Sequence, residues 1–257
     1  MPDDVVALLA GFVIATVTTP VGVSGAVFLL PVQLSVLHVP NPRLTPTNLL
    51  YNVVAGPGGV LRFLGRGRID RALAAQMTTG SVPGVVVGAV LRVHVAADPD
   101  VFRLVAAAVL VPVGVLVLRP PRPAGAGDER RLAPSQVRLL AFGVGIAGGL
   151  YGVGGGSLLG PLLVGCGMAV ATVAPAALLA TWTTSVAGVA AYAVLALDAP
   201  GSVSPDVSIG VCAGLGGLVG GYLGATLQPH LPERALRVLL GVLALSLAGL
   251  YVVQATR

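Results

Sequence analysis

Charged side chains are confined to the ends of every long apolar run in this sequence, and this restricts the fold more than any other feature. A water-soluble domain typically carries about 25% charged residues. Here the proportion is 10%, and 55% of the residues are hydrophobic. Such a chain lacks the polar side chains needed to cover a water-soluble core, so lipid is its expected surrounding. We therefore predict an all-α integral membrane protein.

The apolar runs predict about ten transmembrane or partly re-entrant helices, because a spanning helix needs roughly 20 mainly apolar residues. The second and seventh runs are short and begin with glycines, so they are full spans, broken helices or re-entrant segments. The predicted runs are 5–20, 22–38, 44–61, 72–92, 101–118, 137–151, 154–168, 171–197, 206–228 and 234–254.

A stretch rich in Pro, Gly and charge separates the runs into two sets of five. It predicts a flexible cytoplasmic linker, 119–136, between a first transmembrane repeat, 1–118, and a second, 137–257. Glycines and prolines recur in the same order on both sides of the linker. For example, Gly22 and the following Pro31 correspond to Gly152 and Pro161. We therefore interpret the two parts as repeats.

The arginines predict the orientation of these repeats. With the N-terminus outside, eleven Arg residues fall in inside segments and four in outside segments, as the positive-inside rule requires. An odd number of spans in each repeat inverts the second repeat relative to the first, which is a common transporter architecture. If the second and seventh runs re-enter instead, each repeat has four spans and the two repeats are parallel.

Each repeat contains a Gly-rich turn in front of its short apolar run. Glycines before a helix leave backbone N–H groups that bind an anion without any charged side chain. Irregular backbone within a membrane is tolerated where it lines a cavity or is buried in protein. We predict that the two turns meet near the midplane and bind solute; the alternative is close helix packing through small residues. The predicted donors are Gly22, Ser24, Gly25, Gly154, Gly155, Gly156 and Ser157.

A stripe of polar residues follows each turn. Thr45, Asn48 and Asn52 are spaced by three and four residues, so they share one helix face. The corresponding positions of the second repeat include Thr181 and Ser185. We predict that Asn48, Asn52, Thr181 and Ser185 line the solute site, because Asn and hydroxyl groups donate to oxyanions. The alternative is a polar clamp between helices.

Glycines at every fourth position form a third pattern, which is typical of close helix packing. We interpret these glycines as structural. They are Gly80, Gly84 and Gly88 in the first repeat and Gly216, Gly220 and Gly224 in the second.

Several function classes are disfavoured by what the runs lack. No cluster of ionisable residues predicts a catalytic site, and neither a metal site nor a cofactor is expected. Cys166 and Cys212 lie in apolar runs without CxxC spacing. All fifteen basic residues are Arg, but they lie between the apolar runs and aromatic content is only 4%, so no nucleic-acid partner is expected.

The repeated motifs resemble the sulfite exporter TauE/SafE family of membrane permeases. The resemblance rests on 152–156 followed by Pro161, on 22–26 followed by Pro31, and on the segment 46–52, and it covers nearly the whole chain. It implies a multi-pass protein of the bacterial inner membrane that transports a small sulfur-containing anion such as sulfite or an organosulfonate. The chain departs from the family pattern at Ser24 and Ala26, and at Ala176 and Ala177.

We therefore expect a permease that works by alternating access between the two repeats. Its expected partners are a small sulfur-containing anion and membrane lipid, and a homodimer is left open. An anion channel and a non-transporting membrane scaffold are the alternatives. A membrane-embedded enzyme is disfavoured, because it would need convergent ionisable groups.

Overall fold

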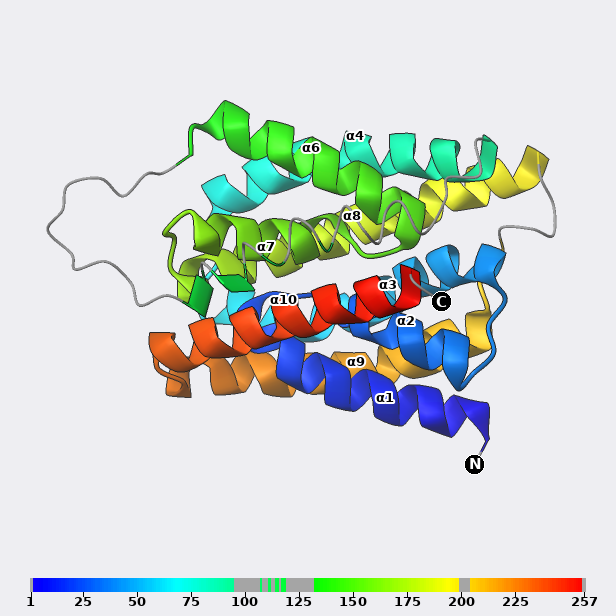
Figure 1. The fold of residues 1–257 in the computed structure, drawn as a ribbon, viewed down its shortest axis with the longest axis horizontal. Helices are drawn as coiled ribbons and strands as arrows, with labels where there is room; N and C mark the ends of the chain where they lie inside the picture. The colour runs from blue at the N-terminus through cyan, green and yellow to red at the C-terminus, as the bar shows by residue number, and fades with distance from the viewer. Residues whose placement is uncertain are drawn as a thin grey trace, which may run out of the picture.

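The computed structural model describes residues 2–94, 107, 111, 114, 115, 117, 118, 132–198 and 204–255. Within these ranges the chain is entirely helical, with nine α-helices and two short 3-10 helices (Figure 1). Most of the predicted run 101–118 and most of the predicted linker 119–136 lie outside the described residues. Both therefore stay predictions.

The described helices coincide within a few residues with the other nine predicted runs, which are thus confirmed as helical. The two 3-10 helices are η1 (Thr19–Val21) and η2 (Gln228–His230). The α-helices are α1 (Asp3–Thr18), α2 (Ala26–Ser35), α3 (Asn41–Gly65), α4 (Arg71–His94), α6 (Pro134–Tyr151), α7 (Gly155–Gly165), α8 (Val170–Asp198), α9 (Val207–Leu227) and α10 (Glu233–Ala255).

Five stretches of the described chain are long and apolar enough to cross a membrane, so the protein is a multi-pass membrane protein. They are Asp3–Val21, Arg71–His94, Val170–Leu197, Val207–His230 and Glu233–Val253. Helix α3 is also long, at 25 residues, but it is more polar because it carries Thr45, Asn48 and Asn52. Helices α2 and α7 are short, with 10 and 11 residues.

Local chemistry explains where several helices begin and end. Asp206 caps α9 by accepting a hydrogen bond from the backbone N–H of Ile209 at 3.2 Å. Pro134 begins α6, where its missing N–H would have no helical partner. Two glycines with left-handed backbone, Gly22 and Gly152, terminate η1 and α6 respectively.

Glycines on α9 allow α1 and α9 to pack closely as parallel helices. A Cβ added at Gly216 or Gly220 would collide with the backbone carbonyl of Leu8 or Phe12, and one at Gly224 would lie 2.7 Å from the Thr16 carbonyl oxygen. Helix α4 packs on α6 in the same way, with Gly80, Gly84 and Gly88 against successive turns of α6. The interpretation of both glycine patterns as packing surfaces is confirmed.

A third helix packs parallel to each of these pairs: α3 joins α1 and α9, and α8 joins α4 and α6. Gly58 of α3 packs against the Leu218 carbonyl of α9. In the other set, Ser81 of α4 hydrogen bonds to Thr184 of α8 at 2.9 Å, and the Tyr192 hydroxyl donates to the Gly149 carbonyl of α6 at 2.7 Å. The result is an α1–α3–α9 group and an α4–α6–α8 group, visible as the lower and upper parts of Figure 1.

The two groups run in opposite directions, because only residues 66–70 connect α3 to α4. Each group combines helices from both sides of the linker, so the two parts of the chain are interleaved. We call the end of the bundle where α1, α3 and α9 begin the outer end, after the predicted orientation, and the opposite end the inner end.

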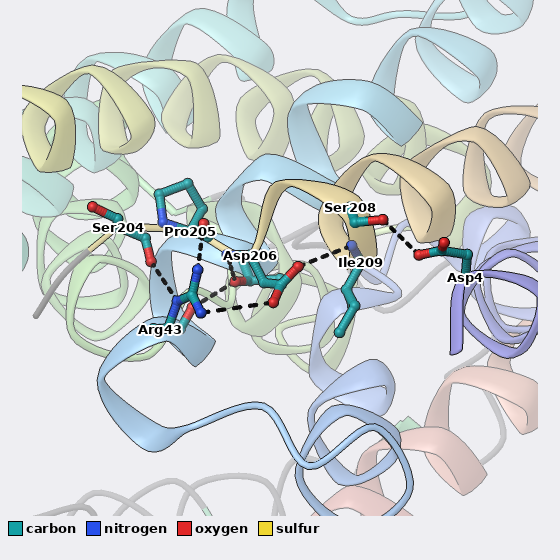
Figure 2. A network of polar contacts seen from close by, with 8 residues as sticks. Asp4, Arg43, Ser204, Pro205, Asp206, Ser208 and Ile209 are labelled. Carbon is teal, nitrogen blue, oxygen red and sulfur yellow. Dashed lines mark hydrogen bonds and ion pairs between the residues drawn. The ribbon is translucent and has the colours of Figure 1, made fainter. Parts of the chain in front are cut away.

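Polar contacts connect the α1–α3–α9 group at its outer end (Figure 2). The Arg43 guanidinium of α3 lies 3.9 Å from the Asp206 carboxylate and donates to the carbonyls of Ser204 and Pro205. The Ser208 hydroxyl of α9 donates to the Asp4 carboxylate of α1 at 2.6 Å. All three helices are therefore held together where they begin.

Candidate functional site

The two Gly-rich turns meet in the interior of the bundle. Gly22 has φ 74° and ψ 17°, and Gly152 has φ 73° and ψ 21°, a left-handed conformation that favours glycine. The backbone N–H of Ser24 in the first turn donates to the hydroxyl of Ser157, just after the second turn, at 3.2 Å. Both serines are buried. Segments 133 residues apart therefore form one centre.

The short helices α2 and α7 begin at this centre. Figure 1 shows α2 leading toward the outer end and α7 toward the inner end. The N-terminus of a helix carries the positive end of its dipole and unpaired N–H groups. Two such termini at one buried place create a positive potential without a charged side chain, which favours an anion.

The first turn fixes the orientation of an asparagine on α3. The Ser24 hydroxyl donates to Asn52 Oδ1 at 2.5 Å and accepts from the backbone N–H of Ala26 at 3.1 Å. Asn52 is only 4% exposed, and its Nδ2 has no hydrogen-bond partner in the protein. Asn52 therefore presents its donor end, not its acceptor end, to the interior.

The second turn is bonded directly to α8. The backbone N–H of Gly156 donates to Thr181 Oγ1 at 3.1 Å. The Ser157 hydroxyl donates to the Val153 carbonyl at 2.8 Å while it accepts from Ser24. Thr181 and Ser157 are thus structural partners of the turns as well as neighbours of the centre.

Gly154 is the position where the unpaired donors converge. It has φ 73° and ψ 142°, a conformation that side chains rarely adopt. A Cβ at this position would lie 2.6 Å from Thr181 Cγ2, 3.3 Å from Asn52 Nδ2 and 3.4 Å from Ser185 Oγ. Ser185 is fully buried and its hydroxyl has no partner in the protein. The absence of a side chain at Gly154 therefore leaves both donors accessible to one small group.

Asn48 lies one helical turn before Asn52. It is fully buried, and neither of its amide atoms has a hydrogen-bond partner in the protein. Its Cβ packs near Gly152 of the second turn. Buried polar atoms are normally hydrogen-bonded, and an unpaired one costs about 1–3 kcal/mol. Asn48, Asn52 and Ser185 together leave four such atoms near the turns.

A small pocket lies beside this centre, between α3 and α8. Its volume is about 30 Å³, which is more than the minimum that one water molecule needs. Its polar lining includes Ser24, Asn52 and Thr181. The other lining residues are Ala15, Thr19, Val23, Gly25, Tyr51, Ala55, Gly56, Gly59, Leu178, Trp182 and Gly217.

The predicted site residues fall into two sets in the structure. One set surrounds the centre: Ser24, Asn48, Asn52, Gly154, Ser157, Thr181 and Ser185. The other four are glycines whose α-carbons face close neighbours: Gly22 the Ala174 carbonyl, Gly25 the Tyr51 hydroxyl, Gly155 the Ser81 hydroxyl and Gly156 the Ala177 carbonyl. The binding role of all eleven residues stays a prediction.

The sequence analysis missed Ser81 as a member of this region. Ser81 is fully buried on α4, hydrogen bonds to Thr184 and donates to the Met77 carbonyl at 2.6 Å. A Cβ at Gly155 would lie 2.9 Å from its hydroxyl oxygen. A polar residue directly after Gly80, inside an apolar run, was the available signal.

The chemistry that this centre offers is neutral hydrogen bonding. The described lining residues carry amide and hydroxyl groups and no charged side chain. Among the described residues, no group of three or more His, Cys, Asp or Glu is placed to hold a metal ion. The centre is thus suited to hold a small polar group, and an anion in particular because α2 and α7 begin there.

The comparisons with known proteins give one match. The family described as "Sulfite exporter TauE/SafE" matches residues 7–252, which is nearly the whole chain. The comparisons with curated proteins and with solved structures give no match.

Proposed function

We propose that this chain, which belongs to the sulfite exporter TauE/SafE family, transports a small sulfur-containing anion across the bacterial inner membrane. The family is one of transporters and not of enzymes, and the helices described above make the chain a multi-pass membrane protein. Sulfite and organosulfonates are the proposed solutes.

The observation that carries this proposal is the convergence of unpaired donors at Gly154. Asn52 Nδ2 and Ser185 Oγ approach that glycine, are buried and have no partner in the protein. An oxyanion would accept hydrogen bonds from both groups. Its charge would be stabilised by the N-termini of α2 and α7. A cation would find no carboxylate among the described lining residues.

We further propose ten membrane crossings in two inverted repeats, 1–118 and 137–257, joined by the linker 119–136. The packing supports this, because each contact recurs between matching helices. Helices α1 and α3 pack on α9 as α6 and α8 pack on α4. Gly22 faces Ala174 of α8, while Gly152 faces Thr45 of α3, which is the matching position of the other repeat.

The proposed mechanism is alternating access, for which the sequence predicts the two repeats as moving units and the packing favours two other units. They are the α1–α3–α9 group and the α4–α6–α8 group, because the polar contacts and glycine surfaces lie mainly within each group. The pocket lies between α3 and α8, where the two groups meet. Rocking of one group against the other would open this pocket to each end in turn.

In the described part of the chain, two side-chain hydrogen bonds cross between the helices of these two groups, and apolar packing such as that of Leu49 near Gly188 joins the groups as well. The Thr45 hydroxyl of α3 donates to the Leu150 carbonyl of α6 at 3.1 Å. The Trp182 indole N–H of α8 donates to the Val53 carbonyl of α3 at 3.2 Å. These features support a gated transporter over a static pore.

The test is solute flux into proteoliposomes that contain the purified protein. Sulfite, thiosulfate, taurine, sulfoacetate, sulfate and chloride would be compared, with protein-free vesicles as the blank. Saturable flux of one sulfur oxyanion or sulfonate is the expected result. Absence of flux for every sulfur anion, from correctly inserted protein, would refute the proposal and favour a membrane scaffold. Rapid flux that does not saturate would favour a channel.

A further inference from the structure

An apolar groove opens on the outside of the α1–α3–α9 group, away from the solute pocket. Its volume is about 280 Å³. Helix α3 contributes Pro57, Gly58 and Leu61, and α9 contributes Leu218, Val219 and Tyr222. Leu61 and Val219 are 65% and 57% exposed. Because Gly58 packs directly against the backbone of Leu218, the two helices are closest there and no side chain of Gly58 fills the space.

Two arginines lie beside one end of this groove. The Arg62 guanidinium lies 5.2 Å from the centre of the Tyr222 ring, and its Nε donates to Thr226 Oγ1 at 2.9 Å. An Arg66 guanidinium N–H donates to the Thr226 carbonyl at 3.5 Å. Within the described part of the chain, neither arginine has a carboxylate partner. Both positive charges are therefore oriented but not neutralised by any described carboxylate.

The arginines and the groove follow one another along the bundle axis, as the charged headgroup and the acyl chains of a phospholipid do. Helices α3 and α9 run in the same direction, and the groove residues precede Arg62 and Thr226 on both. Pro57 lies five residues before Arg62, which at about 1.5 Å per residue places the far end of the groove roughly 8 Å deeper along the bundle axis. Arg62 belongs to the arginines predicted at the cytoplasmic surface. The groove thus lies at the depth of acyl chains and the arginines at the depth of headgroups.

We infer that this face binds one anionic phospholipid of the inner leaflet, with its phosphate on Arg62 and Arg66 and one acyl chain in the groove. Basic pockets between transmembrane helices are suited to anionic headgroups. Arginine holds a phosphate through several N–H donors in a fixed plane. A zwitterionic lipid would also carry a cationic group. Among the described residues no acidic partner for that group lies beside Arg62, so an anionic lipid is favoured.

The first experiment measures lipid binding to the purified full-length protein in detergent by native mass spectrometry. Dioleoyl-phosphatidylglycerol and dioleoyl-phosphatidylcholine have the same acyl chains and differ in headgroup charge. We expect selective retention of phosphatidylglycerol. Arg62→Gln should weaken its binding about fivefold, the contribution of one basic residue near an anionic membrane surface. Arg138→Gln removes an exposed charge of α6 and is the matched control that should leave binding unchanged.

A second variant tests the groove without altering charge. Leu61→Trp places a larger side chain at a highly exposed position, so the protein should fold, while the groove is filled. We expect this variant to lose phosphatidylglycerol as well. Equal retention of the two lipids, or unchanged binding by Arg62→Gln, would overturn the inference. Unchanged binding by Leu61→Trp, or full competition by glycerol 3-phosphate, would show a headgroup site without a chain site and would also overturn it. None of these measurements depends on transport.

Discussion

The hydroxyl of Ser24 donates to Oδ1 of Asn52 at 2.5 Å, and this contact determines which end of the Asn52 amide faces the centre of the protein. An amide can offer either a donor or an acceptor. With Oδ1 bonded to Ser24, the remaining group is Nδ2, which lies near Gly154 and Ser185. The first Gly-rich turn therefore leaves a hydrogen-bond donor of Asn52 facing the centre, which suits the proposed solute, an oxyanion that accepts hydrogen bonds.

Asn52→Leu should abolish most transport without preventing insertion. The change keeps a similar volume but removes one hydrogen bond to a charged solute, worth about 1.5–3 kcal/mol, so we expect kcat/KM for flux to fall roughly ten- to a hundredfold. Flux in proteoliposomes and recovery of folded protein by gel filtration would be measured together. Wild-type flux from well-folded Asn52→Leu protein would remove Asn52 from the site.

Asn52→Asp tests the sign of the solute charge at the same position. The carboxylate keeps the shape of the side chain but repels an anion and cannot donate when ionised. We expect lower flux than from Asn52→Leu, measured in the same vesicles at neutral pH. If Asn52→Asp transports better than Asn52→Leu, the solute bound there is not an anion.

Ser24→Ala should leave the Asn52 amide free to rotate. One buried hydrogen bond contributes about 0.5–1.5 kcal/mol, so we expect solute affinity, measured by thermal shift or KM, to weaken about three- to tenfold. Ser208→Ala removes an exposed hydroxyl at the outer end of α9 and is the matched control. An equal effect from both changes would indicate general destabilisation.

Gly154→Ala should lower both stability and transport. The backbone at φ 73° and ψ 142° is strained for alanine by about 1–3 kcal/mol, and the new Cβ would lie 2.6 Å from Thr181 Cγ2. Gly143→Ala is the control, because that exposed helical position has no neighbour within 4 Å and helix propensity favours alanine by up to about 1 kcal/mol. Thermal unfolding in detergent would separate the two. A Gly154→Ala protein as stable as Gly143→Ala would contradict the described turn.

Cross-linking should distinguish the proposed moving groups from the two repeats. After replacement of Cys166 and Cys212, a disulfide between Asp4→Cys and Ser208→Cys would connect α1 to α9, within one group but across the two repeats. We expect flux to survive this cross-link. A disulfide between Leu49→Cys and Gly188→Cys would connect α3 to α8 across the groups, because a Cβ at Gly188 would lie 3.0 Å from Leu49 Cδ1, and flux should stop until the bond is reduced. The opposite pattern would favour the repeats as moving units.

Most helices could be predicted from the sequence because their apolar runs and punctuating residues are local signals. Glycine alone was enough to predict two further features. These are the turns at Gly22 and Gly152, and the close packing at Gly216 and Gly220. The pairing of α1 with α9 could not be predicted. A glycine surface indicates that some helix packs closely there, but the carbonyls of Leu8 and Phe12 that it contacts carry no sequence signal.

The candidate site was only partly accessible from sequence for a similar reason. Asn52 stood out because an amide inside an apolar run needs a partner. The Ser24 contact that orients it depends on how a turn 28 residues away folds back. Ser81 was missed because its neighbours Gly155 and Thr184 lie on other helices. Gly156 was predicted as a donor, and its N–H does donate, but to Thr181 within the protein.

The interleaving of the two groups has a consequence for how the chain assembles. Helix α1 leaves the ribosome before the other described helices, whereas α9, which covers its closest packing surface, is followed among them by α10 alone. The glycine surface of α4 likewise stays uncovered until α6 has been synthesised. Since both groups need helices from both sides of the linker, a fragment that ends at the linker would contain no complete group. Stable association is therefore expected only after insertion of nearly the whole polypeptide, and chain truncations should be degraded rather than retained as half-proteins.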